Sequence, residues 1–589
     1  HYPLTFLRPH KETNMPIQDN NKMQKQWRSF LLGWIIILIG SVLAHSIQTS
    51  GDIRIKDVRF NGADGNVLSA YLYIPPGVTA ATPAPGILAV HGYINSREVQ
   101  SGFAIEFARR GYVVLAMDQA GHGYSDAPAF ANGFGGPAGL AYLRSLDIVD
   151  KDNIGLEGHS MGGWTILAAA TAYPDDYKSM VLEGSSVGGG RSAPGTTQWP
   201  RNVAVVYSQF DEFSASMWQV PKGSDAKDSA NLKTMFGSAT AVNIGQVYGN
   251  INAGTARVLY SPPVTHPGDH ISRTAIGHSL DWFAQTLEGG TPLPADDQIW
   301  MYKELGTLIA MIGFVLLLCG SFNALLGMPT FANLAKTPES FAYSQRDKRW
   351  WLVAALSAVI PVATFYPFMG WGGQLFGASA LLPQSISSQV AFWGVMNGVL
   401  FTLIGFIIRA QTVQFANSIG KMLLISLATV ASAYSAVLMA DFFFQIDFRF
   451  WFVGIKPLNL MLFQIMLVYL LPFTVFFLLA LRALHGGLSV AGDSPAKQYA
   501  SNILALMGGF LVFLILQYGS LFLSGFLLTP AQPLNTIVML QFVPLLTIVG
   551  VISTYTYRRT ASYLPGAFIN ALFVSCYVVA GQATQFPVN

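Results

Sequence analysis

A serine flanked by glycines is the residue of this sequence best placed to act as a nucleophile. Ser160 lies in the run Gly158-His159-Ser160-Met161-Gly162-Gly163, which follows an apolar segment and leads directly into the helix-forming residues 164–170. A serine hydroxyl is a weak nucleophile until a sharp strand-to-helix turn exposes it to a histidine base and to backbone N–H groups. Small residues on both sides are a steric requirement of that turn. The sequence therefore predicts a nucleophile elbow at Ser160.

A second serine matches the same short pattern. Ser186 lies in Gly184-Ser185-Ser186-Val187-Gly188, but the residues that follow are two glycines, an arginine and, soon after, a proline. Such residues do not begin a helix, so Ser186 lacks the turn that exposes a nucleophile. Because a bare Gly-x-Ser-x-Gly pattern is weak evidence in a chain with 57 glycines, the rest of the sequence must distinguish the two serines.

Composition indicates that much of the chain lies in lipid. Of 589 residues, 52% are hydrophobic and only 11% are charged, and long apolar runs cluster near the start and after Trp300. Residues 51–298, in contrast, have an ordinary globular composition. We expect five parts: a cytoplasmic N-terminal segment (1–28), a transmembrane anchor helix (29–46), an extracytoplasmic domain (51–298), an eight-helix transmembrane domain (300–580) and an extracytoplasmic tail (581–589).

The charge balance of the globular part excludes some partners. Residues 51–298 hold 16 basic and 23 acidic side chains, a net charge of −7, although the whole chain carries +3. An acidic domain is unsuited to a polyanion, so we expect no nucleic-acid partner. The two cysteines, Cys319 and Cys576, both lie in apolar segments, so the sequence implies no disulfide framework.

The distribution of basic residues predicts the orientation in the membrane. Nine apolar spans are expected, and one set of their connections carries most of the Lys and Arg residues, including Arg28, Arg349, Arg409 and Arg558. Basic connections face the cytoplasm. The sequence therefore predicts a protein of the cell membrane with a cytoplasmic N-terminus, and with residues 51–298 and the C-terminus on the outer side. The spans are expected near 29–46, 301–326, 350–368, 389–408, 421–444, 458–481, 500–528, 535–557 and 562–580.

The globular part alternates short apolar runs with helical patterns. Residues 53–60 and 67–74 alternate apolar and polar side chains and predict an antiparallel pair, whereas six later runs are continuously apolar and predict buried parallel strands. The six runs are 86–90, 112–117, 154–156, 180–182, 203–207 and 257–260. Eight strands with the serine after the fifth resemble the α/β-hydrolase fold, a mostly parallel sheet covered by helices on both faces.

That fold places chemistry at the carboxyl ends of its strands, and each relevant end carries a suitable residue. Tyr93 follows the third strand, and its amide is expected to form an oxyanion hole with the amide of Met161. Asp211 follows the seventh strand and can orient an imidazole. His266 follows the eighth. The chain order Ser160, Asp211, His266 matches the order Ser, Asp, His of the fold.

Two histidines compete for the role of base. We rank His266 first, because it lies in the loop after the last strand, and His270 second, because it abuts the following helix. With Asp269 between them, the pair also suggests a metal site. However, Pro267-Gly268 prevents the helical turn that would bring both rings to one face, and no third strong ligand cluster appears, so we expect no metal. Acyl transfer through a serine needs no other cofactor.

The segment from Val264 to Ile271, with Ile276-Gly277 and Trp282-Phe283, resembles the histidine loop and final helix of cutinase-type polyester hydrolases and dienelactone-hydrolase-like esterases. The elbow and the Gly92-Tyr93 turn resemble the nucleophile and oxyanion segments of the same group. The resemblance covers residues 51–290 and implies a serine hydrolase with the triad Ser160, His266 and Asp211. It does not extend to the membrane helices or to residues 212–255, an insertion that is either a lid or a surface excursion packed by its own apolar residues.

We therefore expect a membrane-anchored hydrolase that cleaves carboxylic esters through an acyl-enzyme, with an ester or lipid-like substrate and with membrane lipids as neighbours. The pocket is expected to face lipid headgroups or the outer loop near 441–456. Two alternatives remain open: a peptidase or amidase with the same triad, and a transporter or channel whose hydrolase domain processes or gates its cargo. Transport is the weaker alternative, because the spans hold few ionisable residues, essentially Glu304 and Asp441 near their ends. The sequence leaves the oligomeric state undetermined.

Overall fold

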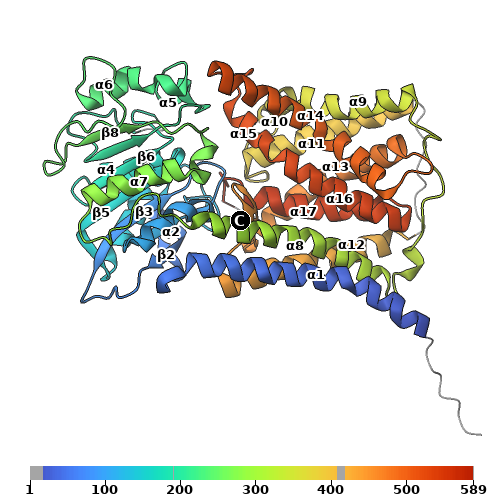
Figure 1. Cartoon of the computed structure of the whole chain (residues 1–589). Coiled ribbons are helices and arrows are strands. Elements are labelled where there is room, and N and C mark those ends of the chain that lie inside the picture. The colour runs from blue at the N-terminus through green and yellow to red at the C-terminus, as the bar shows by residue number, and fades with distance from the viewer. Residues whose placement is uncertain (1–16, 190–191, 408–417, 588–589) are drawn as a thin grey trace, which may run out of the picture.

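The computed structural model describes residues 17–189, 192–407 and 418–587. A globular part built on a sheet lies at one end of a long helical part, and the last described residues, up to 587, lie where the two meet (Figure 1). Residues 1–16 of the expected cytoplasmic segment, residues 588–589 of the expected tail and Arg409 of the charge pattern lie outside the described residues.

The globular part contains an eight-stranded sheet in the order β1-β2-β4-β3-β5-β6-β7-β8. β2 pairs antiparallel with β1 and β4, and every other neighbouring pair is parallel. The expected α/β-hydrolase fold is thus confirmed, with strands close to the predicted runs. Their bounds are β1 Arg54–Asn61, β2 Val67–Ile74, β3 Ala84–Val90, β4 Val113–Met117, β5 Val149–His159, β6 Ser179–Glu183, β7 Val203–Val206 and β8 Arg257–Tyr260.

Helices cover both faces of this sheet, because neighbouring residues of a strand point to opposite sides. On β3, Leu88 packs in a core with α3 (Gly136–Ser145) and α4 (Met161–Ala172). Ile87, its neighbour on the same strand, points to the opposite face of the sheet. There it packs in a separate core with α2 (Ser101–Arg109) and α7 (Arg273–Thr286). Continuous apolar strands are therefore explained by burial on both sides.

The insertion 212–255 packs mainly on its own apolar residues and on the sheet. Its short helices, α5 (Ser214–Met217) and α6 (Ala230–Phe236), contribute Trp218, Leu232 and Met235 to the core that also contains Leu88. Only its first residues reach the cavity described below. Of the two expectations for this segment, a lid or a surface excursion packed by its own apolar residues, most of it matches the second. Its first residues form part of a cavity wall.

The helical part begins with α8 and is apolar throughout. Its elements are α8 Trp300–Leu326, α9 Lys348–Ala363, α10 Phe365–Leu375, α11 Ser385–Ile407, α12 Ile419–Phe444, β9 Phe448–Phe450, β10 Val453–Ile455, α13 Leu460–Leu488, α14 Pro495–Ser524, α15 Pro533–Leu540, α16 Phe542–Thr560 and α17 Leu564–Ala580. Among the described residues of the whole chain, seven helices are long and apolar enough to cross a membrane. The bent pair α9 and α10 gives an eighth if it is one span. α17 is shorter, so the expected count of nine is not supported.

α1 (Ile17–Gln48) packs along α8 for most of its length (Figure 1). Glycines make this approach possible: a Cβ on Gly33 would lie 2.8 Å from the Leu317 backbone, and one on Gly313 would lie 2.8 Å from Ile37. Close contact through small residues is the usual way in which membrane helices associate. The anchor helix is thus a packed member of the bundle.

Buried charges and a short hairpin join the two parts. Nζ of Lys456, just after the β9–β10 hairpin, lies 2.9 Å from Oε2 of Glu98 in the globular part. Burial alone would raise the pKa of the Glu98 carboxyl, but the charges of Lys456, Arg97 and Arg449 hold it well below its usual range. Arg97 in turn pairs with Asp57 on β1. The globular part is therefore held to the bundle by ion pairs shielded from water.

Candidate active site

Ser160 occupies the sharp turn between β5 and α4. Its φ of 56° and ψ of −120° are rare for a residue with a side chain, and such a conformation is the mark of a nucleophile elbow. The surrounding glycines are needed: a Cβ on Gly162 would collide with the carbonyl oxygen of Val90, and one on Gly158 with that of Gly162. The steric requirement inferred from the sequence is therefore met.

The second serine lies in a different environment. Ser186 is fully buried beyond the end of β6, and its hydroxyl contacts Sδ of Met217 at 3.5 Å. It does not line the cavity that contains Ser160. No helix begins after it in the described part of this loop, as its sequence predicts.

Asp211 and His266 are brought together from the ends of β7 and β8. Oδ2 of Asp211 lies 2.7 Å from Nδ1 of His266, and both side chains are buried. Because a carboxylate only accepts hydrogen bonds, this nitrogen carries the proton, which leaves Nε2 as the basic nitrogen of the neutral ring. Burial alone would lower the pKa of His266, but Asp211, with smaller contributions from Glu212 and Asp269, raises it to about 8.

His270 has no such partner. Both of its ring nitrogens are buried without a hydrogen bond in the described structure, and its ring packs 4.1 Å from that of His159. Burial and the neighbouring His159 and His266 lower the pKa of His270 well below its usual value. A carboxylate is thus hydrogen-bonded to His266, the histidine ranked first, whereas His270, ranked second, has no such bond among the described residues.

The amides expected to form an oxyanion hole lie beside the serine. Met161 is the first residue of α4 and directly follows Ser160. Tyr93 follows Gly92 in the loop after β3, and a Cβ added to Gly92 would lie 3.1 Å from Cβ of Ser160. Neither the Met161 N–H nor the Tyr93 N–H finds an acceptor within the residues that the structure describes. The side-chain amide of Gln119 donates a hydrogen bond to the carbonyl of His91, which helps to fix the loop that contains Gly92 and Tyr93.

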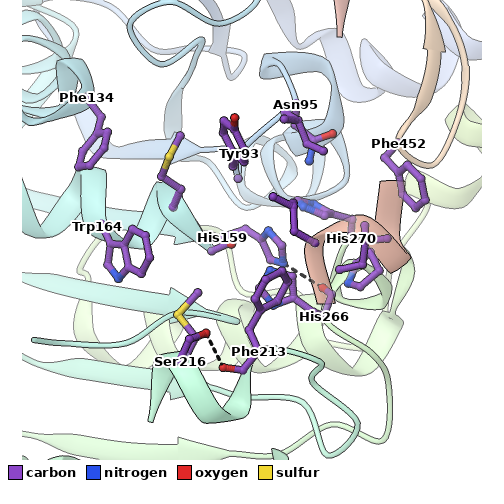
Figure 2. A pocket seen from close by; sticks show the side chains of 18 of the residues that line it. Tyr93, Asn95, Phe134, His159, Trp164, Phe213, Ser216, His266, His270 and Phe452 are labelled. Atoms are coloured by element: carbon purple, nitrogen blue, oxygen red, sulfur yellow. Dashed lines mark hydrogen bonds between the residues drawn. The ribbon is translucent and has the colours of Figure 1, made fainter. Parts of the chain in front are cut away.

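Tyr93, Ser160, Met161, His266 and His270 line one cavity of about 680 Å³. Figure 2 shows the rings of His159, His266 and His270 gathered on one side of it, with Phe452 near His270 and Trp164 toward the opposite end. Its wall also includes Gly92, Tyr93, Ile94, Asn95, Phe130, Phe134, Ser160, Met161, Phe213, Ser216, Met217, Pro267, Leu534, Ile537, Gln541 and Gln585. No Asp, Glu, Lys or Arg is among the described residues that line it.

The hydroxyl of Ser160 makes no hydrogen bond to an imidazole within the described residues, although Ser160 and His266 line the same cavity. Bonds between a nucleophile and its base are often long without substrate and close in the reactive complex. We therefore expect Ser160 and His266 to approach each other when a substrate binds between them.

Several residues of the site have no motif in the sequence. Nε2 of His159 lies 3.0 Å from the carbonyl oxygen of His266, and a carboxylate oxygen of Glu212 accepts from the His266 N–H at 2.8 Å. The other Glu212 oxygen accepts from the hydroxyl of Tyr518 on α14 at 2.9 Å. The position of Glu212 directly after Asp211 is the one signal that could have identified it; nothing local marks Tyr518.

The helical part also supplies cavity wall. Phe452 comes from the β9–β10 hairpin, Leu534 and Ile537 come from α15, and Gln541 is the residue that joins α15 to α16. Gln585 comes from the tail, where the Thr584 N–H donates to the carbonyl of Gly121 at 2.7 Å. Of the two expected neighbours, the loop near 441–456 does reach the cavity, through Phe452.

Comparisons with known proteins agree with this architecture. A family model described as the alpha/beta hydrolase fold matches residues 85–252, and one for acetyl xylan esterase matches residues 27–136. The chain therefore contains an α/β-hydrolase domain, here joined to a helical region with candidate membrane spans.

Three relatives illustrate how far the similarity extends. An uncharacterised protein of Mycobacterium tuberculosis is 30% identical over 222 residues, 35% of this chain and 56% of the relative. The quorum-quenching protein AidA of Acinetobacter baumannii is 33% identical over 129 residues, 19% of this chain and 38% of its own. A monoacylglycerol lipase of Mycolicibacterium smegmatis is 33% identical over 113 residues, 18% and 39% respectively. The chain thus spans little more than half of the first of these relatives.

Among solved structures, the Pyrococcus furiosus esterase Pf2001 is 16% identical and covers 40% of this chain and 94% of its own, with a TM-score of 0.30. The hydrolase GrgF from Penicillium is 13% identical and covers 40% of this chain and 100% of its own, with a TM-score of 0.29.

Proposed function

We propose that this protein is a membrane-anchored serine hydrolase that cleaves carboxylic esters through the triad Ser160, His266 and Asp211. The main support is that His266, which is hydrogen-bonded to the buried Asp211, lines the same cavity as a serine in an elbow conformation. The family models for the α/β-hydrolase fold and acetyl xylan esterase support the ester class.

The proposed reaction is acyl transfer to water. His266 takes the proton of Ser160 as the hydroxyl oxygen attacks the ester carbonyl, and Asp211 holds the imidazole in the required tautomer. The N–H groups of Met161 and Tyr93 stabilise the tetrahedral oxyanion. His266 then protonates the departing alcohol, and a water molecule activated by the same ring hydrolyses the acyl-enzyme. The residues of the chain supply every group that these steps require.

The cavity wall favours an ester with an apolar portion over a peptide. A peptidase that recognises the free amino or carboxyl terminus of a peptide needs a side chain of opposite charge to bind it. The described residues of the wall include no Asp, Glu, Lys or Arg. Its aromatic and aliphatic side chains suit a hydrocarbon group instead. Hydrolysis of an amide by the same triad remains the second candidate.

We further propose that the domain acts on the outer side of the cell membrane. The support is the excess of basic residues in the connections assigned to the cytoplasm. The hydrolase domain and the tail contact each other, which is consistent with one common side for both.

Labelling of the full-length protein by a fluorophosphonate, which reacts with activated serines, tests the nucleophile. Ser160→Ala is expected to abolish labelling, whereas Ser186→Ala, the matched substitution in the similar motif, leaves it intact. His266→Ala is expected to reduce labelling by about a thousandfold or more, because the base is lost, and His270→Ala to retain most of it. Persistent labelling of Ser160→Ala, or loss with His270→Ala alone, would refute the assignment.

A further inference from the structure

The active-site cavity does not end at the hydrolase domain. A second cavity, of about 60 Å³, shares Ile94, Phe452 and Gln541 with the first and lies within the helical bundle. A third, of about 50 Å³, shares Trp393, Phe476 and Leu546 with the second. The shared wall residues place the three cavities next to one another in succession, and this row of adjacent cavities is called the path below.

This path follows the bundle axis away from the catalytic serine. Along α11 the lining residues run from Val390 through Trp393 and Asn397 to Phe401. Eleven residues of helix correspond to a depth of about 16 Å. The path is therefore narrow and long, the shape of an extended hydrocarbon chain.

Its wall is mostly apolar beyond the active site, with Ser357 and Asn397 as the polar side chains of the third cavity. Almost every residue that lines the second cavity is aliphatic or aromatic, and the polar exceptions among side chains are Gln541, Tyr577 and Gln582. The Tyr577 hydroxyl donates to Oε1 of Gln541 at 2.5 Å, whereas Oε1 of Gln582 is buried without a partner among the described residues. Apolar voids stay dry and bind apolar ligands, and each void left empty costs packing energy.

Two features connect the path to the reaction. Ile94 directly follows Tyr93, the proposed oxyanion residue, and its side chain borders both the first and second cavities. Gln541, the residue that joins α15 to α16, borders the same junction. A carbonyl held at Ser160 would thus have the entrance of the path beside it.

We propose that the bundle binds the acyl chain of the substrate, which makes the substrates long-chain acyl esters. This inference rests on the proposed esterase function and adds that the membrane helices form the acyl-chain site. It also gives the other membrane helices a function, since a single anchor helix would be enough to attach the domain to the membrane.

Hydrolysis of p-nitrophenyl esters by the full-length protein in detergent micelles tests this proposal, because the alcohol stays constant while the acyl chain grows. We expect kcat/KM to rise at least about tenfold from acetate to dodecanoate, since each buried methylene adds binding energy. An unchanged or falling kcat/KM along the series overturns the acyl-chain site. If no ester in the series is hydrolysed, the proposed esterase function itself fails.

Filling the second cavity should remove only the gain from chain length. Val390→Phe on α11 and Val538→Phe on α15 each place a ring in that cavity, from two different helices. Each is expected to lower kcat/KM for dodecanoate by about tenfold and to leave that for acetate within about twofold. Hydrolysis of acetate also reports that each variant folds.

The matched control is Val399→Phe, on the same helix but 39% exposed on the outside of the bundle and absent from the cavity walls. It should change neither ester. If both cavity variants hydrolyse dodecanoate as the unmodified protein does, or lose acetate and dodecanoate equally, the chain does not enter the bundle.

Discussion

At the scale of single residues, the chemistry depends on backbone positions that tolerate little variation. Ser160 has a positive φ, which costs free energy in a residue with a side chain and persists only where packing enforces it. The carbonyl of Val90 leaves no room for a Cβ at Gly162. The serine is therefore presented by the local shape of the chain, before any partner approaches it.

The pH dependence of hydrolysis belongs to the same scale. The base must be neutral to accept a proton, and Asp211 raises the pKa of His266 to about 8 against the opposing effect of burial. The rate constant kcat/KM should therefore be low below the pKa, rise with pH and level off above about 8. A profile of kcat/KM for ester hydrolysis against pH measures this rising part of the curve, called the limb below.

Asp211→Asn provides the comparison. Without the negative charge the pKa of His266 falls, so the limb should move to lower pH, while the plateau drops by about 10⁴-fold because the tautomer is no longer held. A limb that stays in place in this variant would show that another group titrates.

At the scale of elements, the loop after β8 is held from several sides. Glu212 accepts from the His266 N–H, and Tyr518 on α14 donates to Glu212. The indole N–H of Trp451 in the hairpin donates to the carbonyl of Pro267 at 2.6 Å. Two elements of the helical part therefore help to set the position of the base.

Tyr518→Phe tests this support. The substitution removes one hydroxyl and its bond to Glu212, so kcat for acetate hydrolysis should fall by about three- to tenfold with KM unchanged. Tyr499→Phe, on the same helix about 28 Å away along its axis, is the control and should retain full activity. Equal losses in both variants would contradict a specific role for Tyr518.

At the scale of the whole molecule, buried ion pairs set the position of the hydrolase domain on the bundle. Glu98, Lys456 and Arg449 are each nearly inaccessible to water, and Tyr124 adds a bond from its hydroxyl to the carbonyl of Pro457 at 3.0 Å. Buried pairs add little net stability, but the loss of one partner leaves an uncompensated charge. The contact therefore favours one arrangement of the two parts.

Lys456→Met should show this dependence. The variant leaves Glu98 without its closest cation, and we expect the free energy of unfolding to fall by about 3 kcal/mol. A lower midpoint of thermal unfolding of the full-length protein in detergent measures the effect. Lys497→Met, at an exposed position at the start of α14, should leave the midpoint unchanged. An unchanged midpoint in Lys456→Met would argue against a structural role for the pair.

Local patterns in the sequence were sufficient to predict the hydrolase fold. The strands lie near their predicted bounds, because continuous apolar runs between helices have few other solutions than a buried parallel sheet. The pairing of Asp211 with His266 followed from the order of the strands. The roles of the site residues stay predictions, as do the domain boundaries and the orientation. The helix count differed because α17 has 17 residues and lies largely buried within the bundle.

The sequence by itself determined the elbow, the candidate acid and base and the division into globular and apolar parts, because each depends on neighbours along the chain. Only the tertiary structure decided that Phe452, Gln541 and Gln585 complete the cavity and that Tyr518 reaches Glu212. These contacts join residues far apart in sequence, and no periodicity or motif records them. Packing between the two parts brings them together, so they could be found only in the folded chain.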